Sequence, residues 1–427
     1  MDISAIHKLF LSCSSVSIDT RKIEANSMFV AIKGDRFDAN TFAKEAIDKG
    51  ASYVIIDNED FYINDQTILV EDSLETLQKL AQFHRNYLKL PIVALTGSNG
   101  KTTTKELIQV VLAEKFNTKA TVGNLNNHIG VPLTLLSFTK DTEIGIVEMG
   151  ANHQKEIEFL CELATPNYGY ITNFGKAHLE GFGGVEGVIK GKSEMYHYLR
   201  ASDGLAFVNL EDAIQLEKSL GIRSFSFGIH KSHADVNIAA VKADPFVAIS
   251  FNDVIIKSQM IGLYNANNVN AAITIGKYLE VDELAIKTAL EGYVPENNRS
   301  QLMSKGTNKI IMDAYNANPS SMAVAIQNFV QLQDLNKVMI LGDMFELGEE
   351  SLQEHKALII SEVIGDDVKS FFVGENFYEN RIVKSNFEFY KTFADFEKYL
   401  KDNLFSDSMI LIKGSRGMAL ERSLNYL

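Results

Sequence analysis

The stretch from Pro91 to Glu106, PIVALTGSNGKTTTKE, constrains the fold more than any other part of the chain. An apolar run meets a turn of small residues, and a helical apolar pattern follows. This order is typical of a phosphate-binding loop. Glycines in the turn let backbone N–H groups converge on phosphate oxygens, and the start of the helix adds partial positive charge. Lys101 adds a full charge, and the Thr102 hydroxyl can bind Mg²⁺.

The loop is a shorter variant of the general nucleotide pattern. That pattern has a glycine five residues before Gly100, where this chain has Leu95. A glycine-containing β-turn that happens to precede a helix would explain the glycines. It would not explain the strand, the lysine and the hydroxyl cluster together, so we favour the phosphate loop.

Length, charge and cysteine content limit the class of protein. A chain of 427 residues can form two or three domains. Acidic residues outnumber basic ones by 55 to 41 without any basic block, so we expect no nucleic-acid partner. No apolar run approaches the roughly 20 residues of a membrane span, and the chain does not open like a secretory signal. Cys13 and Cys161 fit no metal spacing, and we expect a cytoplasmic protein without membrane insertion.

The first 88 residues or so read as a small α/β domain. Apolar runs at 28–32 and 53–56 predict strands, with a helix over 40–49. Two polar clusters, 17–21 and 33–38, contain an arginine and a glycine turn that could hold a diphosphate or a uracil edge. Spacing alone favours solvated turns there.

The middle of the chain places polar residues after predicted strands. A polar loop over 121–132 follows the phosphate-loop helix and is long enough to carry substrate contacts. The strand 144–150 brings Glu148 to the edge of the sheet where the phosphate loop lies, so Glu148 could hold Mg²⁺. Taken alone, His178 after the strand 168–172 reads as a satisfied polar residue, and the lysines on the helix 185–199 read as a solvated face.

Two further clusters precede residue 296. His230 and His233 could be a metal pair, but no other ligand is near them in the sequence, and a surface loop is favoured. Asn265 and Asn268 lie three residues apart at the start of a helix. They share one face and could hydrogen-bond a purine or a ribose.

Beyond the break at 293–298, strands alternate with helices again. Strands are predicted at 309–313, 337–341, 370–373 and 409–412, which indicates a second doubly wound unit. Ligand-type residues follow three of these strands, in the segments 313–319, 342–348 and 413–417. Because the carboxyl ends of parallel strands meet at one edge, these segments predict a site.

Taken together, the motifs resemble the ATP-dependent ligases that build the cytoplasmic peptidoglycan precursor. The resemblance covers essentially the whole chain and rests on TGSNGKTTTKE, GNLNNHIGVPLT, NFGKAHLEGFG, DAYNANPSSM, LGDMFELGEES and KGSRGM, in this order. The phosphate loop and the G-x-x-N-x-x-N stretch are common to all these ligases and to folylpolyglutamate synthetase. DAYNANPSSM and LGDMFELG resemble the branch that adds D-alanyl-D-alanine.

The resemblance implies an α/β fold in three domains. Residues 1–89 would form a small N-terminal domain for the UDP end of the substrate. Residues 90–296 would form a central ATPase domain of the P-loop type with a mostly parallel sheet, and residues 297–427 a C-terminal Rossmann-like domain. Substrates on different domains imply hinge motion at both seams.

The resemblance also implies roles for individual residues. It implies that Lys101, Glu148, His178, Lys192 and Arg416 are catalytic, with Arg416 facing the dipeptide or the acyl phosphate. ATP would be bound by Gly97, Ser98, Asn99, Gly100, Lys101, Thr102, Thr103, Asn265, Asn268, Arg299 and Asp313. Mg²⁺ would be held by Thr102, Glu148, His178 and a carbamylated Lys192, with Lys190 one turn away as the alternative. The other substrates would be bound by Asp19, Thr20, Arg21, Gly34, Asn124, Asn126, Asn127, Asn316 and Asn318. Tyr264 stands where the family usually has histidine, a departure that concerns the purine contact.

The implied reaction joins D-alanyl-D-alanine to UDP-N-acetylmuramoyl-tripeptide through an acyl phosphate, with ATP and Mg²⁺, in peptidoglycan synthesis. A sister activity that adds a single amino acid is the nearest alternative. A nucleotide-dependent scaffold without chemistry is a rival from another class. A folate-tailing enzyme would leave the N-terminal domain without a purpose. We expect a monomer.

Overall fold

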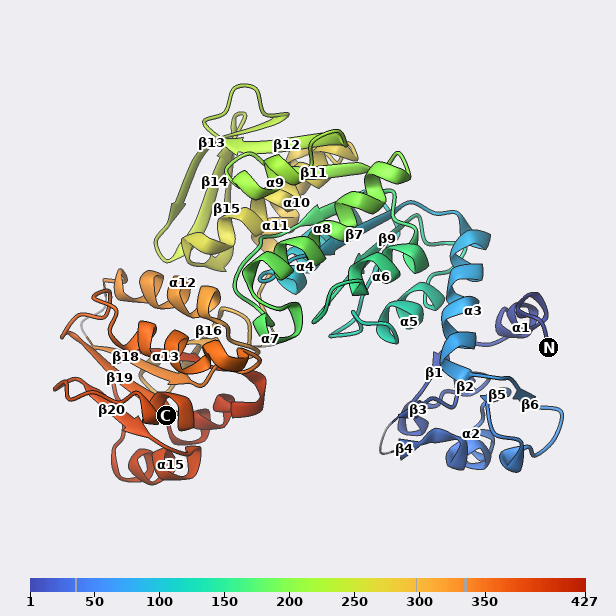
Figure 1. The fold of residues 1–427 in the computed structure, drawn as a ribbon. Coiled ribbons are helices and arrows are strands. Elements are labelled where there is room, and N and C mark those ends of the chain that lie inside the picture. Colours follow the sequence, from blue (N-terminus) through green and yellow to red (C-terminus); the bar gives the residue numbers. More distant parts are fainter. Residues whose placement is uncertain (35–36, 297, 334–335) are drawn as a thin grey trace.

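The computed structural model describes residues 1–34, 37–296, 298–333 and 336–427. Asp35 and Arg36, in the second polar cluster, and Asn297, the predicted start of the C-terminal domain, lie outside the described residues. Three α/β domains follow one another along the chain, and the N- and C-terminal domains lie at opposite ends of the central one (Figure 1). Among the described residues, none of the helices combines the length and the apolar character that crossing a membrane requires.

The N-terminal domain is a parallel four-stranded sheet in the order β1-β2-β5-β6. Its predicted strands and its predicted helix are confirmed, although a 3-10 turn opens the helix. Its elements are α1 (Ile3–Phe10), β1 (Val16–Ser17), β2 (Met28–Val30), the hairpin β3 (Lys33–Gly34) and β4 (Phe37–Asp38), the 3-10 turn η2 (Ala39–Phe42), α2 (Ala43–Asp48), β5 (Tyr53–Ile56), β6 (Thr67–Leu69) and α3 (Ser73–Leu88).

A buried histidine pair holds α1 against α3 and the central domain. His84 Nε2 donates to the carbonyl oxygen of Phe138 at 3.0 Å, so its Nδ1 accepts from His7 Nε2 at 3.0 Å. Both side chains are buried. Burial and the neighbouring His84 lower the pKa of His7 to about 4, and burial lowers the pKa of His84.

We expect this pair to lower stability in acid. The unfolded histidines take up protons near pH 6.5 and the folded pair does not, so its contribution is complete above pH 6.5 and is lost as pH falls towards about 4. Between pH 7 and 4.5 the wild type should lose about 1–3 kcal/mol more in the free energy of unfolding than His7→Gln, which keeps an N–H donor but does not titrate. Urea unfolding across this range measures the difference, and equal slopes would contradict the assignment.

The central domain is built on a nine-stranded sheet in the order β15-β14-β13-β12-β11-β10-β7-β9-β8. In this spatial order, the strands from β13 through β7 to β8 are parallel to one another. At the other end of the sheet, β13, β14 and β15 form an antiparallel meander that we did not predict from the sequence. The strands are β7 (Ile92–Thr96), β8 (Thr118–Ala120), β9 (Ile144–Glu148), β10 (Tyr168–Ile171), β11 (Leu205–Asn209), β12 (Arg223–Ile229), β13 (Val236–Ala243), β14 (Phe246–Phe251) and β15 (Val254–Ile261).

Helices cover both faces of this sheet. Successive β7 residues point to opposite faces, so Ile92 and Ala94 belong to one apolar core, while Val93 and Leu95 belong to the other. This two-sided burial explains why the strand reads as a continuous apolar run. The helices are α4 (Lys101–Ala113), α5 (Gly130–Leu136), α6 (Glu156–Ala164), α7 (Leu179–Phe182), α8 (Val185–Ala201), α9 (Ala213–Lys218), α10 (Ala266–Tyr278) and α11 (Glu283–Gly292).

The C-terminal domain has a six-stranded sheet in the order β16-β17-β21-β18-β19-β20, parallel except for β16. Its four predicted strands are confirmed, and β16 and β20 are additional. Because β21 inserts between β17 and β18, the three polar strand ends predicted to form a site are adjacent. The elements are β16 (Gln301–Lys305), β17 (Asn308–Asp313), α12 (Pro319–Val330), β18 (Lys337–Gly342), α13 (Ser351–Ile359), β19 (Val368–Val373), α14 (Glu375–Glu379), β20 (Phe387–Tyr390), α15 (Phe393–Asp402) and β21 (Met409–Lys413).

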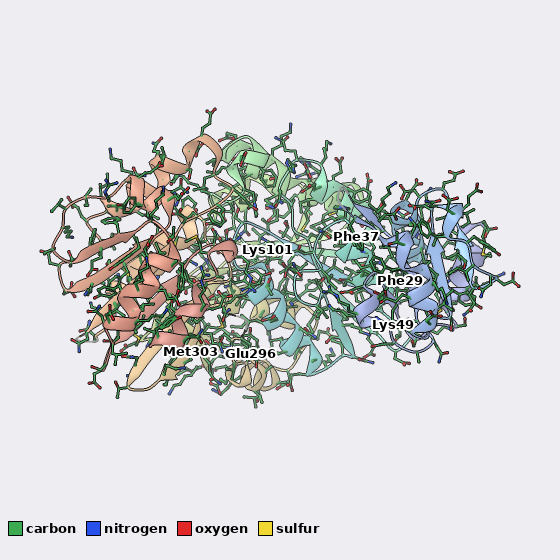
Figure 2. All side chains as sticks on the ribbon, turned by 90° about the horizontal axis from the view of Figure 1, so that it is seen from below. Phe29, Phe37, Lys49, Lys101, Glu296 and Met303 are labelled. Carbon is green, nitrogen blue, oxygen red and sulfur yellow. The ribbon has the colours of Figure 1, made fainter. Side chains whose placement is uncertain are left out.

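Each of the two predicted domain limits falls between the last strand of one sheet and the first strand of the next. The exact limits stay a prediction. In Figure 2, Lys101 lies between the N-terminal region that carries Phe29 and Phe37 and the C-terminal region that carries Met303. The phosphate loop is therefore central in the molecule, and the N-terminal domain stands apart from it.

Candidate functional site

A cavity of about 1120 Å³ lies where the central domain meets the C-terminal domain. The phosphate loop, the ends of β9 and β10 and the start of α10 line it from the central side, and the end of β17 and the start of α12 line it from the other. Seventeen of the predicted site residues line it: Ser98, Asn99, Gly100, Lys101, Thr102, Thr103, Asn124, Asn126, Asn127, Glu148, His178, Asn265, Asn268, Arg299, Asp313, Asn316 and Asn318. Gly97, Lys192, Arg416, Asp19, Thr20, Arg21 and Gly34 are not among its lining residues.

The phosphate loop is held from behind by the segment that follows β10. The Thr172 hydroxyl donates to the Asn99 carbonyl oxygen at 2.6 Å, and the Ser98 hydroxyl donates to the Gly175 carbonyl oxygen at 2.7 Å. The loop enters α4 through Gly100, which has a φ of 79°. The conformation that could present backbone N–H groups to an anion is therefore maintained by neighbouring strands.

A substitution at Gly97 would test how tightly the phosphate loop packs against the segment after β10. The φ of Gly97 is 138°, and a Cβ placed there would lie 2.0 Å from Thr172 Oγ1 and 2.9 Å from the Thr172 backbone nitrogen. We expect Gly97→Ala to cost about 4 kcal/mol or more in the free energy of unfolding. Gly123→Ala is the matched control, because Gly123 also has a positive φ, of 58°, but nothing lies within 4 Å of its Cβ position. It should cost about 1 kcal/mol. Equal costs in urea unfolding would contradict the packing argument.

Lys101 lies in the cavity and bonds to its own loop. Its Nζ donates to the carbonyl oxygens of Gly97 at 2.8 Å and Ser98 at 3.4 Å. Burial lowers the pKa of Lys101, while the nearby Glu148 carboxylate acts in the opposite direction. An anion in the cavity would offer this amine a better partner than two neutral carbonyls.

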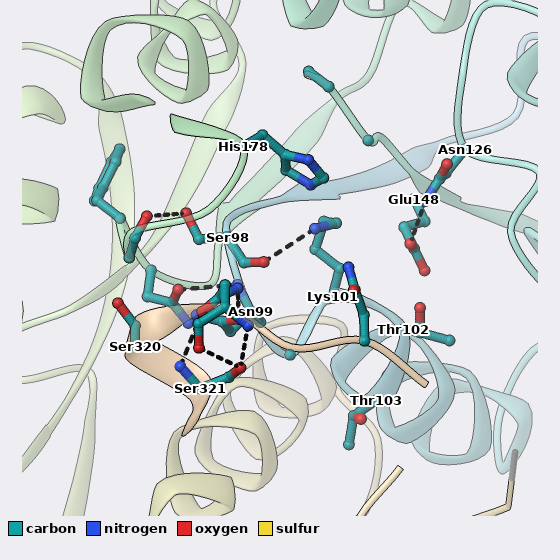
Figure 3. Close-up of a pocket in the computed structure, with 18 of the residues that line it drawn as sticks. Ser98, Asn99, Lys101, Thr102, Thr103, Asn126, Glu148, His178, Ser320 and Ser321 are labelled. Atoms are coloured by element: carbon teal, nitrogen blue, oxygen red, sulfur yellow. Dashed lines mark hydrogen bonds between the residues drawn. The ribbon is translucent and has the colours of Figure 1, made fainter. Parts of the chain in front are cut away.

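Glu148 provides the test of whether a divalent cation fits. Asn126 Nδ2 donates to its Oε1 at 2.8 Å, while Oε2 is buried without a hydrogen-bond partner among the described residues. The Thr102 hydroxyl lines the same cavity, and both side chains lie beside Lys101 (Figure 3). An unpartnered buried carboxylate oxygen is costly, and oxygen donors suit Mg²⁺. The donor set therefore fits the predicted cation, although no three His, Cys, Asp or Glu side chains of the described residues gather as a metal cluster.

The two remaining predicted ligands differ in position. His178 reaches into the cavity above Lys101 (Figure 3), and its Nδ1 contacts Glu346 of the C-terminal domain. Lys192 is buried behind the cavity wall, where its Nζ donates to the Ala151 carbonyl oxygen at 3.1 Å. Burial, together with the charge of Lys101, lowers the pKa of Lys192 well below its usual range. This shift favours the neutral amine, which is the form that could react with CO₂.

Asn265 and Asn268 share one face, as predicted, but their amides bond to protein groups. Asn268 Nδ2 donates to Asn265 Oδ1 at 2.8 Å, and its Oδ1 accepts from the Thr104 hydroxyl at 3.0 Å. Asn265 Nδ2 donates to the Ile261 carbonyl oxygen at 2.7 Å. These bonds tie the start of α10 to the phosphate-loop helix. Binding of ATP by the two residues stays a prediction.

The C-terminal side of the cavity carries a basic group that sequence analysis did not assign. Lys413, at the end of β21, forms a buried ion pair with Asp313 at 2.6 Å. Arg299 lies 3.6 Å above the ring centre of Tyr315, and its Nε is buried without a partner among the described residues. The sequence feature that could have identified Lys413 as a site residue was its position at the end of a predicted strand.

Arg416, which sequence analysis chose from the same segment, lies outside the cavity. Its side chain is 61% exposed and pairs with Glu421 at 3.2 Å. Its catalytic role stays a prediction, one that would require the domains to move.

Two asparagines from the C-terminal motif take up local positions. Asn318 caps α12 by accepting from the Ser321 backbone at 2.9 Å, and its Nδ2 donates to Asn99 of the phosphate loop at 2.7 Å. Asn316 Oδ1 accepts from the next backbone nitrogen at 2.9 Å. The start of α12 therefore touches the phosphate loop directly, a contact between domains that sequence reasoning did not predict.

The predicted UDP-binding turn lies in the N-terminal domain. Arg21 donates to both carboxylate oxygens of Asp19, at 2.8 and 2.9 Å, and these bonds lower the pKa of Asp19 to about 2. The Thr20 carbonyl oxygen accepts from Lys49, and Gly34 lies in the β3–β4 hairpin. These residues are grouped on one domain, separate from the cavity. His230 and His233 lie in a turn after β12, as the surface-loop interpretation expected.

Comparison with known proteins matches all three parts of the chain to one family. Residues 12–85 match "Mur ligase family, catalytic domain", residues 95–276 "Mur ligase middle domain" and residues 298–416 "Mur ligase, glutamate ligase domain". The UDP-N-acetylmuramoyl-tripeptide--D-alanyl-D-alanine ligase of Bacillus subtilis (strain 168) is 34% identical over 417 residues, which cover 95% of this chain and 91% of the relative. The chain belongs to the Mur ligase family.

Solved Mur ligase structures have the same fold over nearly the whole chain. A crystal structure of MurF from Acinetobacter baumannii is 28% identical, with a TM-score of 0.86 and coverage of 99% of this chain and 97% of that one. MurF from Thermotoga maritima in complex with ADP is 27% identical, with a TM-score of 0.83 and coverage of 98% and 97%. The three-domain α/β fold implied by the sequence motifs is therefore confirmed.

Proposed function

We propose that this Mur ligase joins D-alanyl-D-alanine to UDP-N-acetylmuramoyl-tripeptide at the expense of ATP. The observation that carries the proposal is the near-full-length similarity to relatives that bear the name of this activity, at 34% identity for the Bacillus subtilis ligase and 30% for that of Escherichia coli (strain K12). The product would be the UDP-N-acetylmuramoyl-pentapeptide of peptidoglycan synthesis, made in the cytoplasm, in support of cell-wall formation, cell shape and division. The protein would act as a monomer.

The cavity suits the first half of this reaction. A carboxylate oxygen of the tripeptide attacks the γ-phosphorus of ATP, and the bond from this phosphorus to the bridging oxygen breaks. The products of this step are an acyl phosphate and ADP. Negative charge shifts between oxygens throughout, so fixed positive charge and N–H donors are the main requirement. Lys101 and the amides from Gly97 to Thr103 would hold the β- and γ-phosphates. Mg²⁺, when bound by Thr102, Glu148 and His178, would neutralise part of the phosphate charge.

The second half needs the amine of the dipeptide at the acyl carbon. The amine attacks this carbon, the tetrahedral intermediate expels phosphate, and the nitrogen gives up one proton. Lys413 and Arg299 line the cavity from the C-terminal domain and would stabilise the oxyanion or the departing phosphate. Asn316 and Asn318 would position the dipeptide, and Asn124 and Asn127 the tripeptide.

Domain movement follows from the positions of the substrates. The proposed UDP-binding turn at Asp19 and Arg21 lies on a domain separate from the cavity, and the muramoyl-tripeptide would have to bridge the two. Closure of the N- and C-terminal domains over the central one would bring the reacting groups together and exclude water. We expect the hinges at the two predicted domain seams.

Phosphate release from ATP tests the proposal. With UDP-N-acetylmuramoyl-tripeptide present, turnover is expected with D-alanyl-D-alanine and not with single amino acids. Turnover with a single amino acid would assign the sister activity instead, and ATP binding without turnover on any acceptor would favour a scaffold.

A further inference from the structure

The segment LGDMFELGEE, residues 341–350, is prominent in the sequence, and the mechanism above gives it no role. It begins with the last two residues of β18 and lies against α7 of the central domain. The Glu346 carbonyl oxygen accepts from the Glu180 backbone nitrogen at 3.5 Å. Gly348 packs beside the same residue, because a Cβ added to this glycine would lie 3.2 Å from Glu180 Cβ. The segment is therefore part of the contact between the two domains.

Its base is rigid. Asp343 accepts from the backbone nitrogens of Asn376 at 3.0 Å and Phe377 at 3.1 Å, and it is buried. The fully buried His355 accepts from the Met344 backbone at 3.0 Å through Nε2. These bonds fix the path of the chain immediately before Glu346, so the position of its carboxylate is set by the C-terminal domain.

The Glu346 carboxylate meets His178. Its Oε2 contacts His178 Nδ1, and it is the one carboxylate in ion-pairing reach of this histidine among the residues that the structure describes. Nδ1 is shielded from solvent and forms no aligned hydrogen bond with any described residue, so the Glu346 carboxylate in contact with it is the acceptor within reach, while the residue lines the cavity. Both residues have a left-handed backbone, with φ of 53° for His178 and 63° for Glu346. Non-glycine residues rarely hold this conformation, and such strain is concentrated at functional sites.

We propose that Glu346 is a positioning residue for His178. A carboxylate at Nδ1 favours the tautomer that carries the proton there, which leaves the lone pair of Nε2 for a cation in the cavity. The two residues come from different domains, so docking of the C-terminal domain would orient a metal ligand of the central one. The inference rests on the proposed function, in which His178 binds the metal.

Two readouts other than activity test this in the full-length chain. Nitrogen NMR of histidine-labelled protein reports the tautomer of His178, with the signal assigned by its loss in His178→Gln. Titration with Mn²⁺ in the presence of ADP reports metal affinity. Glu346→Asn removes the carboxylate from reach and suits a left-handed backbone. Glu346→Gln keeps an acceptor oxygen. Glu354→Asn is the matched control, since Glu354 pairs with Lys176 across the same interface at 2.5 Å without touching His178.

We expect Glu346→Asn to shift the His178 tautomer and to weaken Mn²⁺ binding by about 10–100-fold, with recovery in Glu346→Gln and no change in Glu354→Asn. An unchanged tautomer and affinity in Glu346→Asn would overturn the inference. Equal weakening by Glu346→Asn and Glu354→Asn, without a tautomer shift, would also overturn it, because the contact would then serve docking alone. The tautomer is measured without substrates, so this measurement does not depend on whether the wild type catalyses the dipeptide reaction. A failure of the proposed function and a failure of this inference can therefore be told apart.

Discussion

Lys101→Met is expected to lower kcat for phosphate release by about 10³-fold while the chain stays folded. The Lys101 amine is the full positive charge that the phosphate-loop motif brings to the cavity, and methionine fills similar volume without it. In the structure Nζ bonds to two loop carbonyls, at 2.8 and 3.4 Å. Burial already lowers the pKa of this amine, so its removal relieves a desolvation cost that offsets the two lost bonds.

The free energy of unfolding of Lys101→Met should therefore stay within about 1 kcal/mol of the wild type. Lys115→Met makes the same change beyond the far end of α4, where Nζ contacts the Leu279 and Glu280 carbonyl oxygens. It should leave kcat unchanged. Turnover at the wild-type rate in Lys101→Met would remove the loop from the chemistry and favour a binding scaffold.

Glu148→Gln is expected to lower kcat by about 10²–10³-fold and to raise the Mg²⁺ concentration needed for half-maximal turnover. The amide oxygen can keep the bond from Asn126, now 2.8 Å long, so the side chain should stay in place. What is lost is the charge on Oε2, a buried atom without a hydrogen-bond partner among the described residues. Such an oxygen is expensive in the folded chain unless a cation meets it.

For this reason Glu148→Gln should be as stable as the wild type or up to about 2 kcal/mol more stable when Mg²⁺ is absent. Glu143→Gln is a suitable control, since Glu143 precedes the same strand at its other end and is exposed. Its kcat and its Mg²⁺ dependence should not change. A Glu148→Gln enzyme with normal Mg²⁺ dependence would show that the cation is held elsewhere.

The local elements of this protein could be predicted because they depend on short-range patterns. The run from Ile92 to Leu95 is apolar because β7 is buried on both faces, and the small residues after it permit the positive φ of Gly97 and Gly100. The strand ends of the C-terminal sheet were predictable for the same reason. The meander β13–β15 was not predicted, because its antiparallel strands follow one another directly at the end of a parallel sheet. No crossover helix between them gave the alternating pattern by which the other strands were recognised.

By itself the sequence determined the small N-terminal α/β unit, the C-terminal doubly wound unit, the phosphate loop and the strand that delivers Glu148, since these follow from apolar periodicity and from glycine, while the division into three domains came from the resemblance to a known family. Only the tertiary structure decided how the domains meet. It joined Glu346 to His178 and Asn318 to Asn99, buried Lys413 against Asp313, and left Arg416 outside the cavity. All three contacts join residues 100 or more positions apart. No local pattern encodes them, because the contacts of Glu346 and Asn318 depend on how whole domains pack, and that of Lys413 depends on which strands are neighbours in the C-terminal sheet.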